Sequence, residues 1–261
     1  MSFSPRQDLE LIRSAAREAG DLARRLAKAG VKVDIKPDGT PVSEADLAVD
    51  QFLFDHLMRA RPDYGWLSEE TADDPARLRC ERVFIVDPID GTRAFIKGAP
   101  WWVVSIAVVE HGRTIAGALY APDLDQMFEA SLHGGAFVNG EAARPSLVDR
   151  LEGARVLGDP ARLVPPVWPA LHIEQRNSIA LRMALVAAGS FDAVIAFGKK
   201  RDWDLAAAAL IVEEAKLRVS DHLGGAIAFN SPSASAKSLI CGSAALVELI
   251  LDKTRPIDQN R

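Results

Sequence analysis

Apolar residues recur at helical spacing in two stretches near the start of the chain. Spacings of three and four residues predict a helix over residues 7–29, which Gly30 would end. A second helix is predicted from Ser43 to about Arg59. Five of its apolar residues are assigned to its buried side: Leu47, Phe52, Phe54, Leu57 and Met58. The segment KPDGTP, between the two helices, has the composition of a turn.

Short apolar runs predict strands in the middle of the chain. Residues 83–86 predict a buried strand that ends at Asp87. Residues 103–109 and 114–120 predict a hairpin, because a short segment containing Gly joins two runs rich in β-branched residues. A further strand is predicted over residues 126–130, and the dipeptide Asn139-Gly140 after it is a strong turn signal.

The second half of the chain alternates helical and strand patterns. Residues 141–175 show no long regular element. Beyond them we predict helices over 178–188, 204–215 and 244–251, and strands over 191–197 and 239–241. Strands mixed with helices in both halves predict an α/β (α+β layered) fold. We divide it into an N-terminal α+β half, 1–145, and a C-terminal α/β half, 146–261, which form one continuous catalytic unit.

Composition and charge exclude several classes of protein. The chain has 261 residues, with 31 Lys+Arg against 36 Asp+Glu, and a net charge of -5 leaves no basic footprint for nucleic acid. Its two cysteines, Cys80 and Cys241, are too few for a disulfide framework and indicate free thiols in a reducing compartment. No apolar run approaches the roughly 20 residues of a membrane helix. We therefore expect a cytoplasmic protein that binds neither nucleic acid nor membrane.

The segment Asp87-Pro88-Ile89-Asp90-Gly91-Thr92 carries the strongest chemical signal. Two carboxylates three residues apart at the end of a buried strand repel each other and lose solvation. A divalent ion such as Mg²⁺ removes that conflict, because hard cations prefer carboxylate oxygens. The backbone amides of Gly91 and Thr92 could face an anion. An ordinary acidic turn has the same composition, so this segment alone leaves both interpretations open.

Three other acidic positions bear on that choice. Glu69 and Glu70 follow a short apolar run, and Asp204 lies near a predicted helix start, where an acid is favourable for electrostatic reasons alone. Asp46 fits a capping box with Ser43 as the N-cap residue, which is a purely structural role. None of the five histidines falls in a metal-spaced cluster.

Taken together, the motifs resemble the inositol monophosphatase superfamily of Mg²⁺-dependent, lithium-inhibited phosphomonoesterases. The likeness rests on LSEE (residues 67–70), DPIDGTRAF (87–95) and DWDLAAAALIVEEA (202–215), in the family's order, with PVSEAD and GGAFVNG in support. It covers the chain from about Leu9 to Leu251. It implies alternating helix and sheet layers, as in the inositol monophosphatase and fructose-1,6-bisphosphatase type, with the site between the two halves. Many members of the family are homodimers, and the apolar run at Trp101 and Trp102 is assigned either to such a contact or to the core.

The resemblance also implies roles for individual residues. Two or three Mg²⁺ ions would be held by the side chains of Glu69, Asp87, Asp90 and Asp204 and by the backbone carbonyl of Ile89. Asp46 and Thr92 would orient or deprotonate the attacking water, so that with Glu69 they form the catalytic set. The substrate phosphate would meet Gly91 and Thr92, with Asp204 and Ser178 also placed at the substrate.

Two departures from the family pattern separate this chain from typical relatives. Family members often have Gly-Gly after the helix that Asp204 opens, whereas this chain has Lys216-Leu217, a change we expect to leave the chemistry intact. Inositol-1-phosphatases have a glutamate before that helix that contacts sugar hydroxyls, and its nearest counterparts here are Ala196 and Phe197.

A basic segment follows the missing acid and changes the expected substrate. Lys199 and Arg201, with Lys200 between them, would suit a second phosphate, although a solvated basic turn has the same composition. This favours a small-molecule phosphate monoester of the 3'(2'),5'-bisphosphate nucleotidase class. The alternatives are an inositol-1-phosphate phosphatase, a histidinol-phosphate phosphatase, and a non-catalytic regulatory protein on the same fold.

Overall fold

Two long helices pack side by side at the N-terminal end of the fold. The computed structural model describes residues 3–258. Helix α1 spans Pro5–Ala29 and ends at Gly30, as the sequence predicts, but it begins two residues before the predicted start, after an N-cap serine. Helix α2 spans Glu44–Ala60 and follows the predicted N-cap, Ser43.

The buried side of α2 differs from the prediction. Leu47 and Phe54 are 52% and 38% exposed, so assigning them to the core was wrong. The face that packs inward repeats every four residues, through Ala45, Val49, Leu53 and Leu57. The first of these positions is the small residue Ala45. Leu47 and Phe54 were assigned to the core because they are large and apolar, but they lie on a different face of α2.

A seven-stranded sheet forms the centre of the N-terminal half. Its strand order is β3-β4-β5-β6-β7-β8-β9, with β3 and β4 parallel and the other neighbours antiparallel. The strands span Gly65–Ser68, Arg82–Asp90, Val103–Glu110, Arg113–Ala121, Gln126–Ser131, Gly135–Val138 and Glu141–Ala142. The predicted hairpin is β5–β6, and Asn139-Gly140 turns the chain between β8 and β9.

A five-stranded sheet forms the centre of the C-terminal half. Its order is β11-β10-β12-β16-β14, with spans His172–Glu174, Arg155–Gly158, Ala193–Ala196, Leu239–Gly242 and Arg218–Ser220. Two short pairs complete the strands: β1 (Val33–Ile35) with β2 (Pro41–Ser43), and β13 (Lys200–Arg201) with β15 (Ser235–Ala236). The remaining helices are α3 (Thr92–Ile96), α4 (Ile179–Ala187), α5 (Asp202–Glu214) and α6 (Ala244–Asp258), and short 3-10 turns cover Pro75–Arg79 and Pro122–Leu124.

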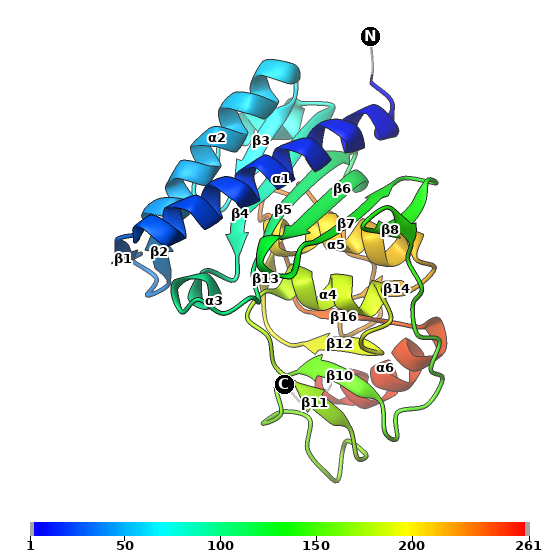
Figure 1. The fold of residues 1–261 in the computed structure, drawn as a ribbon. Coiled ribbons are helices and arrows are strands. Elements are labelled where there is room, and N and C mark those ends of the chain that lie inside the picture. The colour runs from blue at the N-terminus through cyan, green and yellow to red at the C-terminus, as the bar shows by residue number, and fades with distance from the viewer. Residues whose placement is uncertain (1–2, 259–261) are drawn as a thin grey trace.

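Helices and sheets alternate in five layers (Figure 1). Alternate residues of the seven-stranded sheet face two separate cores: Phe84 and Val86 pack with α1 and α2, while Val83 and Ile85 face α4 and α5. A third core joins the five-stranded sheet to α6. The layered fold is thus confirmed. The division at residue 145 stays a proposal, and it falls between the last strand of the first sheet and the first strand of the second.

Helix α5 lies very close to the seven-stranded sheet. A Cβ placed on Gly117 of β6 would lie 2.7 Å from the carbonyl oxygen of Ala207, so no side chain fits there. The hydroxyl of Thr114 donates to the Ala206 carbonyl at 2.9 Å, and that of Ser105 donates to the Trp203 carbonyl at 3.3 Å. The alanine run of α5 thus seats the helix directly on the sheet, which fixes the position of its first turn.

The C-terminus of α5 carries the departure noted in the sequence. The Lys216 N–H donates to Glu213 and the Leu217 N–H donates to Val212, which together form a Schellman motif. Lys216 occupies its left-handed position with φ 65°. Glycine meets no steric penalty in that conformation, so Lys216 introduces local strain.

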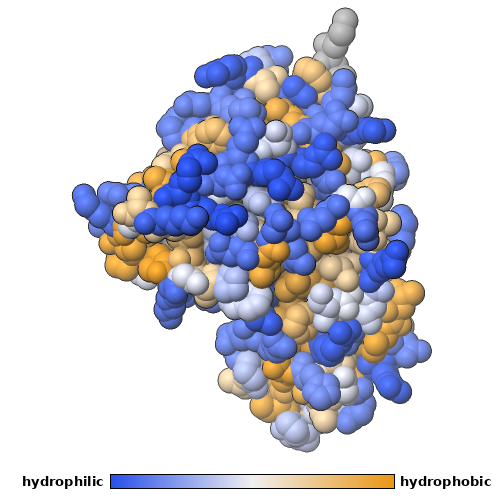
Figure 2. All heavy atoms as spheres, viewed as in Figure 1, coloured by the Kyte–Doolittle hydropathy of each residue, from blue (hydrophilic) through white to orange (hydrophobic). Residues whose placement is uncertain are grey.

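Other sequence-based assignments can be compared with the structure directly. Trp102 is 1% exposed and belongs to the core, whereas Trp101 is only partly buried. Both cysteines are free thiols, as predicted. Within residues 3–258, every helix is too short or too polar to cross a lipid bilayer. The face in Figure 2 is largely polar, with apolar residues in scattered patches. Val33 and Ile35 of β1 are exposed.

Candidate active site

Three acidic side chains from distant parts of the sequence meet in one place. Carboxylate oxygens of Glu69, Asp87 and Asp204 all lie within 4.8 Å of one another. Glu69 follows the end of β3, Asp87 lies in β4, and Asp204 lies in the first turn of α5. Because β3 and β4 are parallel neighbours and α5 packs against the same sheet, the fold brings these three residues together.

Asp87 and Asp90 are separated by a β-bulge. Asp87 pairs with Ser105 and Asp90 with Val103, so three residue steps on β4 match two on β5. The bulge contains Pro88, which has no N–H to donate to a ladder. Asp90 Oδ2 accepts hydrogen bonds from the Ser178 hydroxyl at 2.5 Å and from the Ala180 N–H at 2.7 Å. One oxygen of Asp90 is therefore held by the start of α4, beside the three-residue cluster.

Burial and mutual repulsion raise the pKa values of these acids. Burial is the main cause for Asp87, whose pKa lies well above its usual range, and the charges of Glu69, Asp90 and Asp204 add to it. Burial raises the pKa of Asp90 to about 6, although its bonds from Ser178 and Ala180 act in the opposite direction. Burial and the charge of Asp90 raise the pKa of Asp204 to about 8. A cation among these oxygens would relieve the repulsion.

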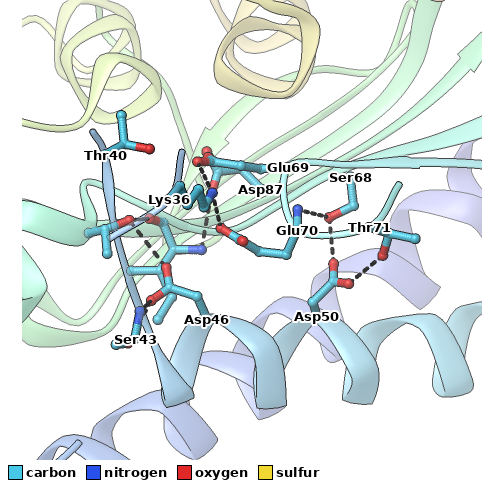
Figure 3. Close-up of polar contacts among 12 residues, drawn as sticks. Lys36, Thr40, Ser43, Asp46, Asp50, Ser68, Glu69, Glu70, Thr71 and Asp87 are labelled. Atoms are coloured by element: carbon cyan, nitrogen blue, oxygen red, sulfur yellow. Dashed lines mark hydrogen bonds and ion pairs between the residues drawn. The ribbon is translucent and has the colours of Figure 1, made fainter. Parts of the chain in front are cut away.

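A lysine that the sequence analysis did not single out reaches this cluster (Figure 3). Lys36 lies in the turn between β1 and β2, and its Nζ is 2.8 Å from both Glu69 Oε1 and Glu70 Oε1. Although burial alone would lower the pKa of Lys36, the two carboxylates outweigh it and raise the pKa. Burial raises the pKa of Glu70 to about 7, against the effect of Lys36. The turn thus places a positive charge directly on the acidic site.

Asp46 combines both roles that the sequence suggested for it. Its Oδ2 accepts from the N–H and the hydroxyl of Ser43, at 2.8 Å and 2.6 Å, which completes the capping box of α2. Its Oδ1 accepts from the Thr92 hydroxyl at 3.2 Å, and that hydroxyl is also 3.2 Å from the Ile89 carbonyl. Burial raises the pKa of Asp46, although these hydrogen bonds oppose the shift. Asp46 is therefore a rigidly held, partly basic partner for Thr92.

Asp50, one turn further along α2, anchors the segment that carries the two glutamates (Figure 3). It accepts hydrogen bonds from the hydroxyls of Ser68 and Thr71, the latter at 2.6 Å. These two residues flank Glu69 and Glu70, so the carboxylate of Asp50 fixes both ends of the turn. Asp50 and Lys36 give no signal in the sequence, because neither has a spacing that distinguishes it from the other charged residues of a helix and a turn.

Gly91 begins the short helix α3 in a conformation that favours glycine. Its φ is 102°, and a Cβ there would lie 2.7 Å from the carbonyl oxygen of Trp101. Its own carbonyl accepts from the N–H groups of Ala94 and Phe95. The geometry explains the glycine, while phosphate binding by the Gly91 and Thr92 amides stays a prediction.

Ser178 is placed differently from the prediction. It is fully buried as the N-cap residue of α4, where its hydroxyl accepts from Leu181 N–H and donates to Asp90. Because its only proton is engaged with Asp90, a direct contact between this hydroxyl and a substrate stays a prediction. Ser178 orients Asp90.

The three basic residues before α5 point in different directions. Lys199 is exposed, whereas Lys200 Nζ donates to the carbonyls of Phe197 and Gly198, both at 3.1 Å. The guanidinium of Arg201 lies over the Trp203 ring, 4.5 Å from its centroid, and donates to the Ser233 carbonyl. They form no single cationic surface, so Lys199 and Arg201 stay predictions as substrate contacts.

Comparison with known proteins identifies the family. Residues 5–259 match the model of the inositol monophosphatase family. An inositol-1-monophosphatase of Mesorhizobium japonicum is 35% identical, with 83% of this chain and 86% of the relative covered. A histidinol-phosphatase of Mycobacterium tuberculosis is 34% identical (85% and 93% covered), and the 3'(2'),5'-bisphosphate nucleotidase CysQ of Escherichia coli O157:H7 is 32% identical (83% and 91% covered). The crystal structure of the extragenic suppressor protein suhB from Bartonella henselae superposes with a TM-score of 0.82 at 30% identity, covering 95% of this chain and 98% of that one.

Proposed function

Because this chain belongs to the inositol monophosphatase family, it is a metal-dependent phosphatase, and we propose that Mg²⁺ is its metal and a small bisphosphorylated molecule its substrate. The observation that carries this proposal is the meeting of Glu69, Asp87 and Asp204 within 4.8 Å. Three carboxylates this close together repel one another, so a metal cation shared among them would be favourable.

The residues present fit Mg²⁺ in their donor chemistry. Every ligand atom in the cluster is a carboxylate oxygen, and hard oxygen donors suit Mg²⁺ rather than a soft metal. We propose that Asp90 and the Ile89 carbonyl complete the set, since they lie on the same bulged stretch of β4. When bound, such ions supply charge neutralisation for phosphoryl transfer and a more acidic water.

The chain's own groups would position the water that attacks phosphorus. We assign Thr92 Oγ1 as the acceptor of a hydrogen bond from that water, with its own proton directed to Asp46 Oδ1 at 3.2 Å. Asp46 is held by Ser43 and has a raised pKa, so it takes up a proton more readily than an ordinary aspartate. Lys36 balances the negative charge of Glu69 and Glu70.

Two features support a second phosphate on the substrate. The position of the sugar-binding glutamate is occupied by Ala196, which is buried, and Phe197, neither of which offers a carboxylate to hydroxyl groups. Lys199 and Arg201 follow shortly after them in the chain and add positive charge. The alternatives are inositol 1-phosphate and histidinol phosphate, since relatives of similar identity carry those names.

The proposal is tested by phosphate release from four substrates with and without Mg²⁺. We would compare adenosine 3',5'-bisphosphate, inositol 1-phosphate, histidinol phosphate and fructose 1,6-bisphosphate. Mg²⁺-dependent turnover with preference for the first is expected, and preference for another would correct the substrate class. Asp87→Asn should abolish turnover, whereas Asp149→Asn, an exposed charge-matched control, should not. If the wild-type protein hydrolyses none of them, the regulatory interpretation is favoured.

A homodimer and a cytoplasmic location stay predictions. The homodimer can be tested by analytical ultracentrifugation.

A further inference from the structure

Arg77 is a charged residue that lies almost wholly inside the protein. It belongs to the short 3-10 turn Pro75–Arg79 and is 2% exposed. A buried guanidinium is costly unless its N–H groups have acceptors, so its partners show what it holds in place. Those partners come from both halves of the chain.

On one side, Arg77 binds both oxygens of the Asp73 carboxylate. Its Nε donates to Asp73 Oδ1 at 2.6 Å, and its Nη2 donates to Oδ2 at 2.9 Å. This pairing holds the pKa of Asp73 below its usual range. Asp73 lies four residues after Glu69, and Asp50 already holds the turn between them. The segment that carries Glu69 is therefore attached to α2 through Asp50 and to Arg77 through Asp73.

On the other side, Arg77 reaches the loop that precedes β15. Its Nη1 donates to Asn230 Oδ1 at 2.6 Å, and its Nη2 donates to the Ser231 carbonyl at 3.2 Å. The N–H of Asn230 donates in turn to Asp202 Oδ2 at 2.7 Å. Because Asp202 is the first residue of α5, this loop links Arg77 to the start of that helix.

The same loop runs along the start of α5. The N–H of Asp202 donates to the Ala234 carbonyl at 3.0 Å, and the short strands β13 and β15 pair Arg201 with Ser235. The N–H of Arg201 donates to Asp204 Oδ2 at 2.8 Å. The position of Asp204 therefore depends on a helix start that this loop holds on one side.

Charge also links Arg77 to the start of α5. Asp202 is fully buried, and its Oδ1 has no hydrogen-bond partner in the described part of the chain. Burial raises the pKa of Asp202 to about 6, while a backbone hydrogen bond and the charges of Arg77 and Arg201 oppose the shift. Arg77 is thus a countercharge for two acids, one from each half of the chain: Asp73 and Asp202.

We propose that Arg77 is a positioning residue of the metal site, and that the bridge Asp73–Arg77–Asn230 holds the Glu69 segment and the start of α5 together. The effect on Mg²⁺ rests on the proposed function, whereas the bridge itself needs no metal. Carboxylate oxygens of Glu69 and Asp204 lie within 4.8 Å of each other although like charges repel. Because the segments that carry them are bonded to one guanidinium, the bridge opposes their separation before a cation binds.

A purely local role for Arg77 makes a different prediction. Gly65 of β3 lies against the backbone of Arg77, since a Cβ on this glycine would be 3.1 Å from the Arg77 Cα. If Arg77 only supports this packing, its loss lowers the stability of the fold and leaves Mg²⁺ affinity unchanged. If it bridges the two segments, its loss loosens both of them and weakens Mg²⁺ binding.

Arg82 supplies a matched control, because it is a second buried arginine with carboxylate partners. It is 7% exposed, and its guanidinium pairs with Asp8 at 2.9 Å and with Glu110 at 2.8 Å. It begins β4, whereas Asp87 lies toward the other end of that strand. Arg77→Gln and Arg82→Gln should therefore both lower the melting temperature, but only Arg77→Gln should disturb the metal site.

Hydrogen exchange of the metal-free protein, followed by mass spectrometry, tests the bridge directly. In Arg77→Gln we expect the amides of residues 69–74 and 229–235 to exchange at least about tenfold faster than in the wild type. Arg82→Gln should leave both segments unchanged. Faster exchange in only one of the two segments, in neither of them, or to the same extent in Arg82→Gln refutes the bridge.

A Mg²⁺ titration followed by thermal shift measures the consequence for the site. Arg77→Gln should weaken the apparent affinity for Mg²⁺ about tenfold, and Arg82→Gln should leave it within about threefold. Asn230→Gly removes one acceptor and suits the φ of 57° at that position, so it should cause a smaller loss in the same direction. Unchanged affinity in Arg77→Gln would overturn the positioning role. Without any Mg²⁺-dependent shift in the wild type, the proposed metal site fails and the positioning role with it, while hydrogen exchange still decides the bridge.

Discussion

Replacing Asp204 by asparagine should stabilise the metal-free protein while destroying its metal site. Asp204 lies within 4.8 Å of Glu69 and Asp87, and burial with the charge of Asp90 raises its pKa to about 8. Between the unfolded value of 3.8 and about 8, the folded state holds a proton that the unfolded state has lost. Stability therefore falls as pH rises through this range, since folding must take up a proton that becomes scarcer.

The size of this effect follows from the pKa difference. Each pH unit corresponds to about 1.4 kcal/mol, so the difference of about 4 units sets a ceiling of about 6 kcal/mol at pH 8 and above. Asp204 is partly exposed, and the carboxylates around it share the proton. We therefore expect about 3 kcal/mol of added stability in Asp204→Asn at pH 8, and under about 1 kcal/mol at pH 5. The asparagine oxygen can still accept the Arg201 N–H, which preserves the helix start.

Urea unfolding followed by circular dichroism, in EDTA at pH 5, 6.5 and 8, measures the difference. Asp149→Asn, exposed and remote from any contact described above, is the matched control and should have no effect. With Mg²⁺ at 1,000 times its Kd for the wild type the order should reverse, because the wild type then gains about 4.1 kcal/mol of stability and the variant, without a metal site, gains none. If Asp204→Asn is no more stable than the wild type at pH 8 without metal, the carboxylates do not repel one another as described.

Three further predictions test other parts of the structure. Lys216→Gly should raise the free energy of unfolding by about 0.5–1 kcal/mol, because glycine removes the strain at φ 65° at a modest entropic cost, and an unchanged urea midpoint would contradict it. Thr92→Ala should lower kcat by about 10² or more with KM within about threefold, whereas Thr92→Ser should keep most activity; a normal kcat in Thr92→Ala would exclude this residue from positioning water. Ser178→Ala should weaken Mg²⁺ affinity about 10–100-fold in a thermal-shift titration, because Asp90 loses a hydrogen bond that orients it, and unaltered affinity would show that Asp90 needs no such support.

The sequence predicted the local elements well because each depended on local chemistry. Ser43, Gly30 and Asn139-Gly140 act within a few residues of themselves, and the structure uses each of them as expected. The layered fold also followed, since apolar runs alternate with helical patterns. The buried face of α2 could not be predicted in the same way. Ala45 is buried because neighbouring elements cover it, and its small side chain gives little hydrophobic signal in the sequence.

The site was only partly accessible from the sequence. Glu69, Asp87 and Asp204 were identified from motifs, and their meeting depends on strand pairing and on the seating of α5. Lys36 gave no such signal, because a single charged residue in a turn has the same composition whether it faces water or an acidic site. Its position became visible only from the distances that tertiary structure creates.

The close contact between Gly117 and Ala207 makes this phosphatase sensitive at positions that have no chemistry. A methyl group added at Gly117 would push the helix outward and carry Asp204 away from its partners, while the rest of the protein kept its shape. A genetic screen scored on turnover alone would then report an inert glycine among the essential residues. Only a separate measurement of folding would show that the variant is still folded and that its turnover is lost because Asp204 has moved away from its partners.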